Sequence, residues 1–261
     1  MAYTIYIYRF PNSNEFEIKW AGNYGAKGEK RGPKEKATPE QIEKQNQWLK
    51  EKKAIRTVKL NFFKGDLWCT LLYPRGTRKS IEEIKDDKRN FLTKLRKEYK
   101  KRGSPLKWML RIEIGSRGGI HMHFLCNQIR GEPIDMVIQK AWGHGRVHFE
   151  RFAGEEEDYQ RLASYLVKAE NEEQQERLNK MKPGDRKALV SYSTSRNLKR
   201  PVPEKKEYKR RTLKSLIEDG IKPTPGYYID KQSIHSGVNQ FTGMSYLYYT
   251  EVKVDPGGGS G

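Results

Sequence analysis

Residues 118–125 read GGIHMHFL, and this run holds two histidines two positions apart, His121 and His123. Apolar residues alternate with them, which is the pattern of a β-strand with one buried face. Residues two apart on a strand point to the same side, so both imidazoles share one face while the apolar side chains pack behind them. The stretch therefore predicts a strand that presents a pair of metal ligands.

The segments around this strand indicate a sheet with alternating helices. Further strands are expected at residues 67–73, 106–114 and 145–152, and helices at residues 80–102, 133–142 and 156–180. The order strand–helix–strand–strand–helix–strand–helix is that of an α+β protein. It predicts a ferredoxin-like, mostly antiparallel central sheet with flanking helices.

The two ends of the chain have weaker patterns. A strand at residues 3–10 with a hairpin partner at 15–20, a helix from Thr38 to about residue 52, a basic helix over 204–219 and extra strands within 226–254 are expected. The last of these segments is rich in tyrosine, and most of its aromatic side chains are expected in a sheet core, with base stacking as the alternative.

The composition restricts the class of partner. The chain has 52 Lys and Arg against 33 Asp and Glu, a formal net charge of +19. An excess of this size indicates a polyanionic partner, either nucleic acid or an acidic membrane surface. The sequence shows neither a long apolar run nor a secretory signal, so a membrane partner is not expected and a cytoplasmic location is. Cys69 and Cys126 stand in apolar runs and are expected to be buried, reduced thiols.

A tyrosine on the helix at 156–180 is a candidate nucleophile. On a helical wheel, Arg161, Tyr165 and Lys168 fall roughly opposite the apolar stripe that contains Tyr159 and Leu162. Neighbouring cations favour the phenolate form of a tyrosine, which is a better nucleophile than the phenol. Tyr159 is the rival nucleophile, but its place on the stripe favours core packing.

The two histidines need a third ligand to make a metal site. Glu113 stands on the preceding strand, and in an antiparallel hairpin its carboxylate can face the same side as His121 and His123. Two imidazoles and one carboxylate suit Mn²⁺ or Mg²⁺. His144 and His148 are rival ligands, but the glycines around them predict a turn and a strand, so a surface position or a DNA contact is favoured.

The ordered motifs resemble those of HUH endonucleases, in particular rolling-circle replication initiator (Rep) proteins of bacterial plasmids and single-stranded DNA phages. The matching stretches are Thr70-Leu71-Leu72-Tyr73, Glu113 with Gly119-Ile120-His121-Met122-His123, Trp142 with Gly145 and Val147, Tyr165-Leu166-Val167-Lys168, and Ser195-Arg196-Asn197-Leu198. The resemblance covers roughly residues 67–201, and the order and spacing of the set are more specific than any one motif.

The resemblance implies an enzyme that nicks and joins single-stranded DNA at an origin hairpin. Tyr165 would form a 5′-phosphotyrosine, Glu113, His121 and His123 would bind the divalent metal, and Lys168 would assist the metal–phosphate assembly or the phenolate. Some phage relatives carry a second tyrosine at the position of Ala169, so a single-tyrosine enzyme is expected here. A second protomer or a water activated by an acid such as Glu172 would then complete strand transfer.

The resemblance also implies a domain division and partners. Residues 1–182 would form the catalytic domain with an N-terminal extension, residues 183–254 a C-terminal extension that packs on it, and residues 255–261 an appended linker. Because the sequence has no phosphate-binding loop motif, a host helicase and a host polymerase are expected partners, in a bacterial cell. The alternatives are a single-tyrosine HUH transposase, a mobilisation relaxase, or a nucleic-acid-binding module without catalysis.

Overall fold

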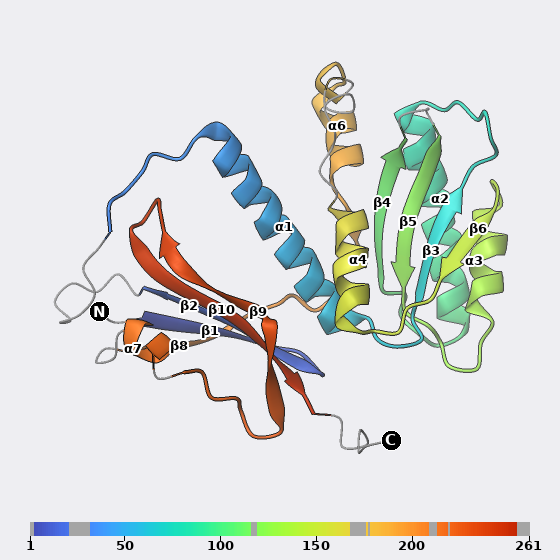
Figure 1. The fold of residues 1–261 in the computed structure, drawn as a ribbon. Coiled ribbons are helices and arrows are strands. Elements are labelled where there is room, and N and C mark those ends of the chain that lie inside the picture. Colours follow the sequence, from blue (N-terminus) through green and yellow to red (C-terminus); the bar gives the residue numbers. More distant parts are fainter. Residues whose placement is uncertain are drawn as a thin grey trace. The chain divides into compact units, whose positions relative to one another are not determined.

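The computed structural model describes residues 3–20, 32–115, 119–167, 176, 178–208, 213–218 and 220–254. The chain divides into two compact units, each of which contains a five-stranded sheet (Figure 1). One unit is Gln45–Arg200, and the other combines Met1–Lys44 with Pro201–Gly261. These limits differ from the sequence-based division after residue 182, because strands from both ends of the chain pair in one sheet.

The Gln45–Arg200 unit contains a βαββαβ arrangement. Its elements are β3 (Leu67–Leu72), α2 (Ile81–Lys101), β4 (Trp108–Ile114), β5 (Ile120–Cys126), α3 (Ile134–Trp142) and β6 (Val147–Glu150), and the two-residue strand β7 (Ser193–Thr194) extends the sheet. The strand order is β6-β3-β5-β4-β7, and every pairing is antiparallel. The predicted α+β class and antiparallel sheet are confirmed, and the order of the first four strands is that of a ferredoxin-like sheet.

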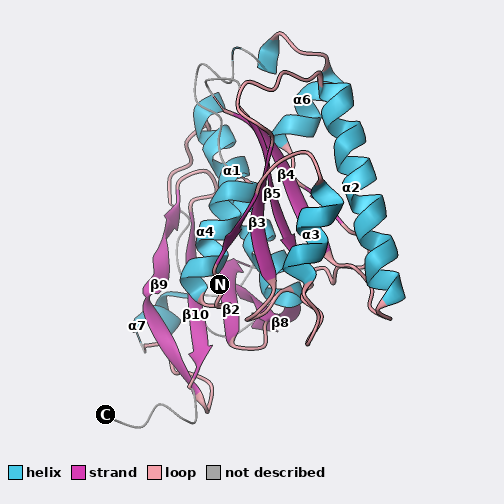
Figure 2. Ribbon diagram, turned by 90° about the vertical axis from the view of Figure 1, so that its right-hand side faces the viewer, coloured by secondary structure: helices cyan, strands magenta, loops and turns pink. Residues whose placement is uncertain are grey.

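Each face of this sheet is covered by its own pair of helices (Figure 2). On one face, α2 and α3 pack on Ile112, Met122 and Phe124. On the other face, the end of α1 (Pro39–Asn61) and α4 (Glu156–Leu166) pack on Trp68 and Leu125. The alternation of the strands thus leaves one face free of α2 and α3, and the histidines stand on that face.

The helix boundaries show where local signals sufficed. Thr38 caps α1, and Ser80 caps α2 through a capping box with Glu83, both as predicted. However, α1 continues nine residues beyond the expected end near residue 52, because Ala54 and Val58 pack in the core. The described part of α4 ends at Leu166, and the remainder of the predicted helix lies largely outside the described residues. The short helix α6 (Pro183–Val190) was not expected from the sequence.

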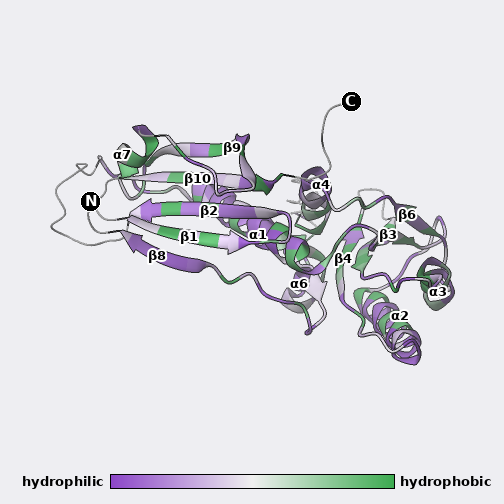
Figure 3. Ribbon diagram, turned by 90° about the horizontal axis from the view of Figure 1, so that it is seen from below, coloured by the Kyte–Doolittle hydropathy of each residue, from purple (hydrophilic) through white to green (hydrophobic). Residues whose placement is uncertain are grey.

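The other unit is a sheet with the strand order β8-β1-β2-β10-β9. Its elements are β1 (Tyr3–Arg9), β2 (Ser13–Trp20), β8 (Glu204–Tyr208), α7 (Leu213–Glu218), β9 (Tyr227–Asn239) and β10 (Met244–Lys253). The predicted N-terminal hairpin and C-terminal strands are confirmed. Apolar and polar residues alternate along β1, β2 and β10 (Figure 3), and Ile18, Leu213 and Leu247 belong to the core of this unit.

The prediction of a basic helix over residues 204–219 is wrong for its first part. Residues Glu204–Tyr208 form β8, which pairs antiparallel with β1, and the Tyr3 and Tyr208 rings stack with centroids 5.1 Å apart. A strand edge provided by the distant N-terminus therefore overrides the local helical pattern. No helix among the described residues has the length and apolar character needed to cross a membrane.

Candidate metal and tyrosine site

The β4–β5 hairpin brings the three predicted metal ligands together. Glu113 on β4 stands directly opposite His121 on β5, in an antiparallel register. Directly opposed residues share a face of the sheet, so the Glu113 carboxylate faces the same side as both imidazoles. Met122 and Phe124 are buried on the opposite face, as the alternation predicted.

Both imidazoles converge on the same carboxylate oxygen. The Nε2 atoms of His121 and His123 lie 3.2 and 2.9 Å from Oε2 of Glu113. The site is largely enclosed, because the side chains of His123 and Glu113 are 7% and 9% exposed, while that of His121 is 24% exposed. His121 is therefore the ligand nearest to solvent, and an incoming substrate would approach from its side.

The donor set fits a divalent cation. One ligand atom from each of the three residues lies within 4.8 Å of the others, and they form the one such group found among the described residues. Neighbouring ligands in an octahedral site with bonds of about 2.1 Å are about 3 Å apart, which agrees with the spacing of the Nε2 and Oε2 atoms. These residues can hold a metal ion and leave coordination positions for water and phosphate oxygens.

Residues on neighbouring strands surround His123. Its Nδ1 lies 3.4 Å from Oγ1 of Thr70, which stands opposite it on β3. A partner on Nδ1 fixes the orientation of the ring and turns Nε2 toward the metal position. Arg111 stands opposite His123 on β4 and is 1% exposed, so a buried guanidinium group lies on the same face of the sheet.

Tyr165 lies beside the triad. Its ring centroid is 4.8 Å from that of His123 and 5.6 Å from that of Trp68. The sequence placed this tyrosine on the polar side of α4, whereas the structure makes it half-buried against the core. Tyr165 follows Leu162 by three residues, and residues three apart lie on neighbouring parts of a helix surface. The buried stripe of α4 therefore carries Tyr165 toward the histidines.

The remaining sequence candidates fall into separate places. Lys168 and Glu172 lie outside the described residues. Tyr159 is buried in the core, and burial raises the pKa of its phenol to about 12, which fits packing rather than nucleophilic attack. His235 is exposed, as expected. Neither His144 nor His148 belongs to the group of metal ligands.

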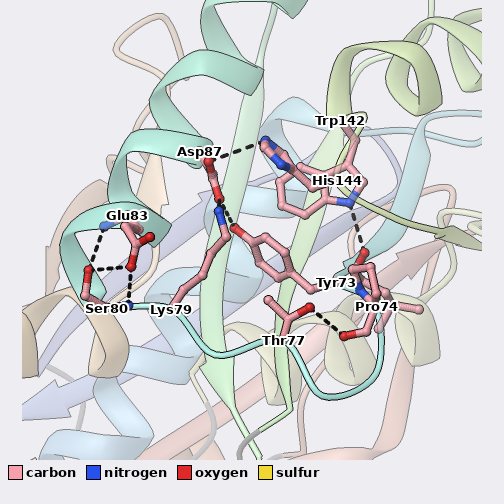
Figure 4. Close-up of polar contacts among 10 residues, drawn as sticks. Tyr73, Pro74, Thr77, Lys79, Ser80, Glu83, Asp87, Trp142 and His144 are labelled. Atoms are coloured by element: carbon pink, nitrogen blue, oxygen red, sulfur yellow. Dashed lines mark hydrogen bonds and ion pairs between the residues drawn. The ribbon is translucent and has the colours of Figure 1, made fainter.

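A second polar cluster lies behind the sheet, at the end of β3 (Figure 4). Tyr73 donates a hydrogen bond of 2.7 Å to Asp87 on α2, and Lys79 forms an ion pair with the same carboxylate. Nε2 of His144 lies 3.4 Å from Oδ1 of Asp87. Burial would raise the pKa of Asp87, but the hydrogen bonds from Lys79 and Tyr73 and the charge of His144 hold it below its usual range.

Trp142 and Gly145 fix the strand β6 next to this cluster. Nε1 of Trp142 donates a hydrogen bond of 3.1 Å to the Leu72 carbonyl. A Cβ at Gly145 would lie 2.2 Å from the same carbonyl oxygen, so a residue without a side chain is required there. The motif of Trp142, Gly145 and Val147 thus positions β6 against β3.

Sequence analysis missed Asp87, although a signal was present. Asp87 lies between Ile84 and Phe91 on the buried side of α2, and a carboxylate within an apolar stripe indicates a paired, buried charge. Both cysteines are free and buried, as predicted, and burial raises the pKa of Cys126 to about 12.

Comparison with known proteins assigns a likeness to the segment that carries this site. No curated protein and no solved structure matched the chain. Residues 66–170 match a family model whose description is that of a replication-associated protein of the ORF2 type. The matched segment begins just before β3 and contains Glu113, His121, His123, Tyr165 and Lys168. This part of the chain is therefore similar to replication-associated proteins.

Proposed function

We propose that the protein nicks and rejoins single-stranded DNA at a replication origin through Tyr165, as an HUH endonuclease that initiates rolling-circle replication. The observation that carries the proposal is the position of the Tyr165 ring, 4.8 Å from that of His123, beside a set of three metal ligands. The likeness of residues 66–170 to replication-associated proteins supports the same activity.

Glu113, His121 and His123 would hold a Mn²⁺ or Mg²⁺ ion, which supplies Lewis-acid polarisation and orientation of the scissile phosphate when bound. The phenolic oxygen of Tyr165 attacks the phosphorus, a Tyr–O–P bond forms and the P–O3′ bond breaks. The proton lost by the phenol is balanced by the proton that the 3′ oxygen gains. Attack by another 3′-hydroxyl reverses these changes and joins the strands.

The proposal includes a role for Lys168 next to the phosphate or the phenolate, and a single-tyrosine reaction. A host helicase and polymerase would unwind and extend the origin, in the cytoplasm of a bacterial cell. The site distinguishes this function from that of a binding module without catalysis, because a module of that kind would form no covalent product and would need no metal.

The direct test is covalent capture of DNA. The chain is mixed with a labelled pool of single-stranded oligonucleotides and Mn²⁺, and adducts stable in SDS are counted and sequenced. We expect Tyr165→Phe to reduce adduct formation by roughly 10³-fold or more while DNA binding is retained. A chelator should also suppress the adduct.

Tyr159→Phe is the matched control, because it removes a hydroxyl group from the same helix but leaves the core ring in place. This variant should form the adduct at the rate of the unaltered chain. An adduct that persists in Tyr165→Phe would exclude Tyr165 as the nucleophile, and an unaltered chain that yields no adduct with any oligonucleotide would count against the enzyme.

A further inference from the structure

The edge strand β6 continues the metal-binding face of the sheet beyond the triad. Thr70 on β3 stands opposite His123 on one side and opposite His148 on the other. One step along, Leu72 stands opposite His121, and its amide donates a hydrogen bond of 2.9 Å to the Arg146 carbonyl. Because opposed residues share a face, Arg146 and His148 belong to the same face as the metal ligands.

Both side chains are available for a ligand. Arg146 and His148 are exposed, and neither side chain forms a hydrogen bond or ion pair within the part of the chain that the structure describes. This sets them apart from His144, which contacts Asp87, and from Arg161, which pairs with Asp158. A pair of nitrogen-bearing groups without acidic partners favours an anion.

The spacing suits a second phosphate of the same DNA strand. Adjacent strands of a sheet are about 4.8 Å apart, so β6 is about 10 Å from the strand that carries the histidines. Between them, Thr70 and the half-buried Leu72 form the surface that the intervening sugar and base would cross. Glu150 stands opposite Trp68, one row farther from Arg146, and its carboxylate would limit the anion site to Arg146 and His148.

The position of these two residues is fixed by the fold. Trp142 and Gly145 hold the beginning of β6 against the Leu72 carbonyl, and Leu72 also pairs with His121. The distance between the cations and the metal ligands is therefore set by a continuous hydrogen-bonded sheet. Rigid elements of this kind position binding groups more precisely than loops do.

We propose that Arg146 and His148 form a phosphate-binding track that holds the single DNA strand next to the scissile phosphate. The inference rests on the proposed function, and it adds the direction in which the strand leaves the metal site, across β3 toward β6. Arg146 contributes charge and hydrogen bonds, and His148 contributes an imidazole N–H donor. Because phosphates lack sequence information, the track contributes affinity and register rather than base specificity.

Binding measurements test the track apart from catalysis. In a Tyr165→Phe background, the affinity for an oligo-dT strand is measured over a range of salt concentrations. Arg146→Ala should weaken binding about tenfold, the size of one lost charged hydrogen bond. It should also make the log–log salt slope shallower by about 0.7, the value for one phosphate contact on a single strand. His148→Ala should weaken binding in the same direction.

Arg96→Ala is the charge-matched control. Arg96 is exposed on α2, the helix that covers the other face of the sheet, so its loss should leave affinity and slope unchanged. Thermal unfolding of each variant checks that the fold is intact. Arg146→Ala and His148→Ala variants that are folded and bind as tightly as the Tyr165→Phe chain would overturn the track, and a protecting role for these residues at a sheet edge would remain.

A second experiment locates the contact on DNA. Single phosphates on either side of the cleavage site are replaced by uncharged methylphosphonates. One such replacement should weaken binding of the unaltered chain but cause no further loss in Arg146→Ala, which is the pattern of a direct contact. Losses that simply add at every position would contradict the track. Adduct formation by the unaltered chain is measured in parallel, so that failure of the nuclease proposal is seen separately.

Discussion

At the scale of single residues, the site depends on the orientation of His123. Its Nε2 faces Oε2 of Glu113 at 2.9 Å, and its Nδ1 faces the Thr70 hydroxyl at 3.4 Å. A histidine that binds a metal through one nitrogen is usually oriented by a partner on the other. The three residues come from three adjacent strands, so the sheet register itself sets the orientation of the ring.

Thr70→Val tests this contact, because valine keeps the shape of the side chain and removes the hydroxyl group. We expect the affinity for Mn²⁺ to fall about tenfold to hundredfold, measured by calorimetry without DNA. Thr70→Ser restores a hydroxyl and should recover most of the affinity. Equal metal affinity in Thr70→Val and in the unaltered chain would show that the hydroxyl does not orient the ring.

At the scale of secondary-structure elements, β3 connects the metal face with the cluster behind the sheet. Alternate residues of this strand face opposite sides, so Thr70 reaches His123 whereas Tyr73, just after the strand, reaches Asp87 on α2. The Leu72 carbonyl is held by Trp142 between these two contacts. The Asp87 cluster therefore stabilises the strand on which both the metal ligands and β6 are aligned.

The pKa of Asp87 predicts how this cluster depends on pH. An unfolded aspartate has a pKa of about 3.9, and the value in the folded protein is lower. The stabilisation is therefore fully present above about pH 5 and is lost as the pH falls through the folded pKa. Asp87→Asn should lower the free energy of unfolding at pH 7 by about 2 kcal/mol and weaken its decline in acid.

Denaturant unfolding between neutral and acidic pH measures this effect. Asp86→Asn is the control, because Asp86 is the next residue on α2 and pairs with Arg89 at the exposed surface. Its replacement should change stability by less than about 0.5 kcal/mol. If Asp87→Asn and the unaltered chain lose stability in acid to the same extent, the carboxylate does not stabilise the end of β3.

At the scale of the whole molecule, the two units have separate hydrophobic cores. Both cores around the metal-binding sheet consist of residues between Ala54 and Leu198, and a third core joins residues from the two ends of the chain. Asn61 hydrogen-bonds with the backbone of Lys199, so the first and last parts of the Gln45–Arg200 unit are joined. A domain with its own core can in principle fold alone.

A fragment of residues 45–200 is therefore expected to fold cooperatively and to form the metal-dependent DNA adduct. Circular dichroism during heating measures the first property and covalent capture the second. The matched comparison is Tyr165→Phe in the same fragment, which should fold but form no adduct. A fragment that unfolds without a cooperative transition would show that the other unit is needed for stability.

The sequence alone determined the βαββαβ order, the shared face of His121 and His123, and the position of Glu113 opposite them, because strand alternation and hairpin pairing act over short distances. The roles of Tyr165 and Lys168 remain predictions. Tertiary structure decided the length of α1, the strand at Glu204–Tyr208 and the pairing of the chain's two ends. It also decided the place of Asp87 and the alignment of His148 with His123 through Thr70. These features depend on partners far away in the sequence, and packing against such partners outweighs local propensities whose differences are only about 1 kcal/mol per residue.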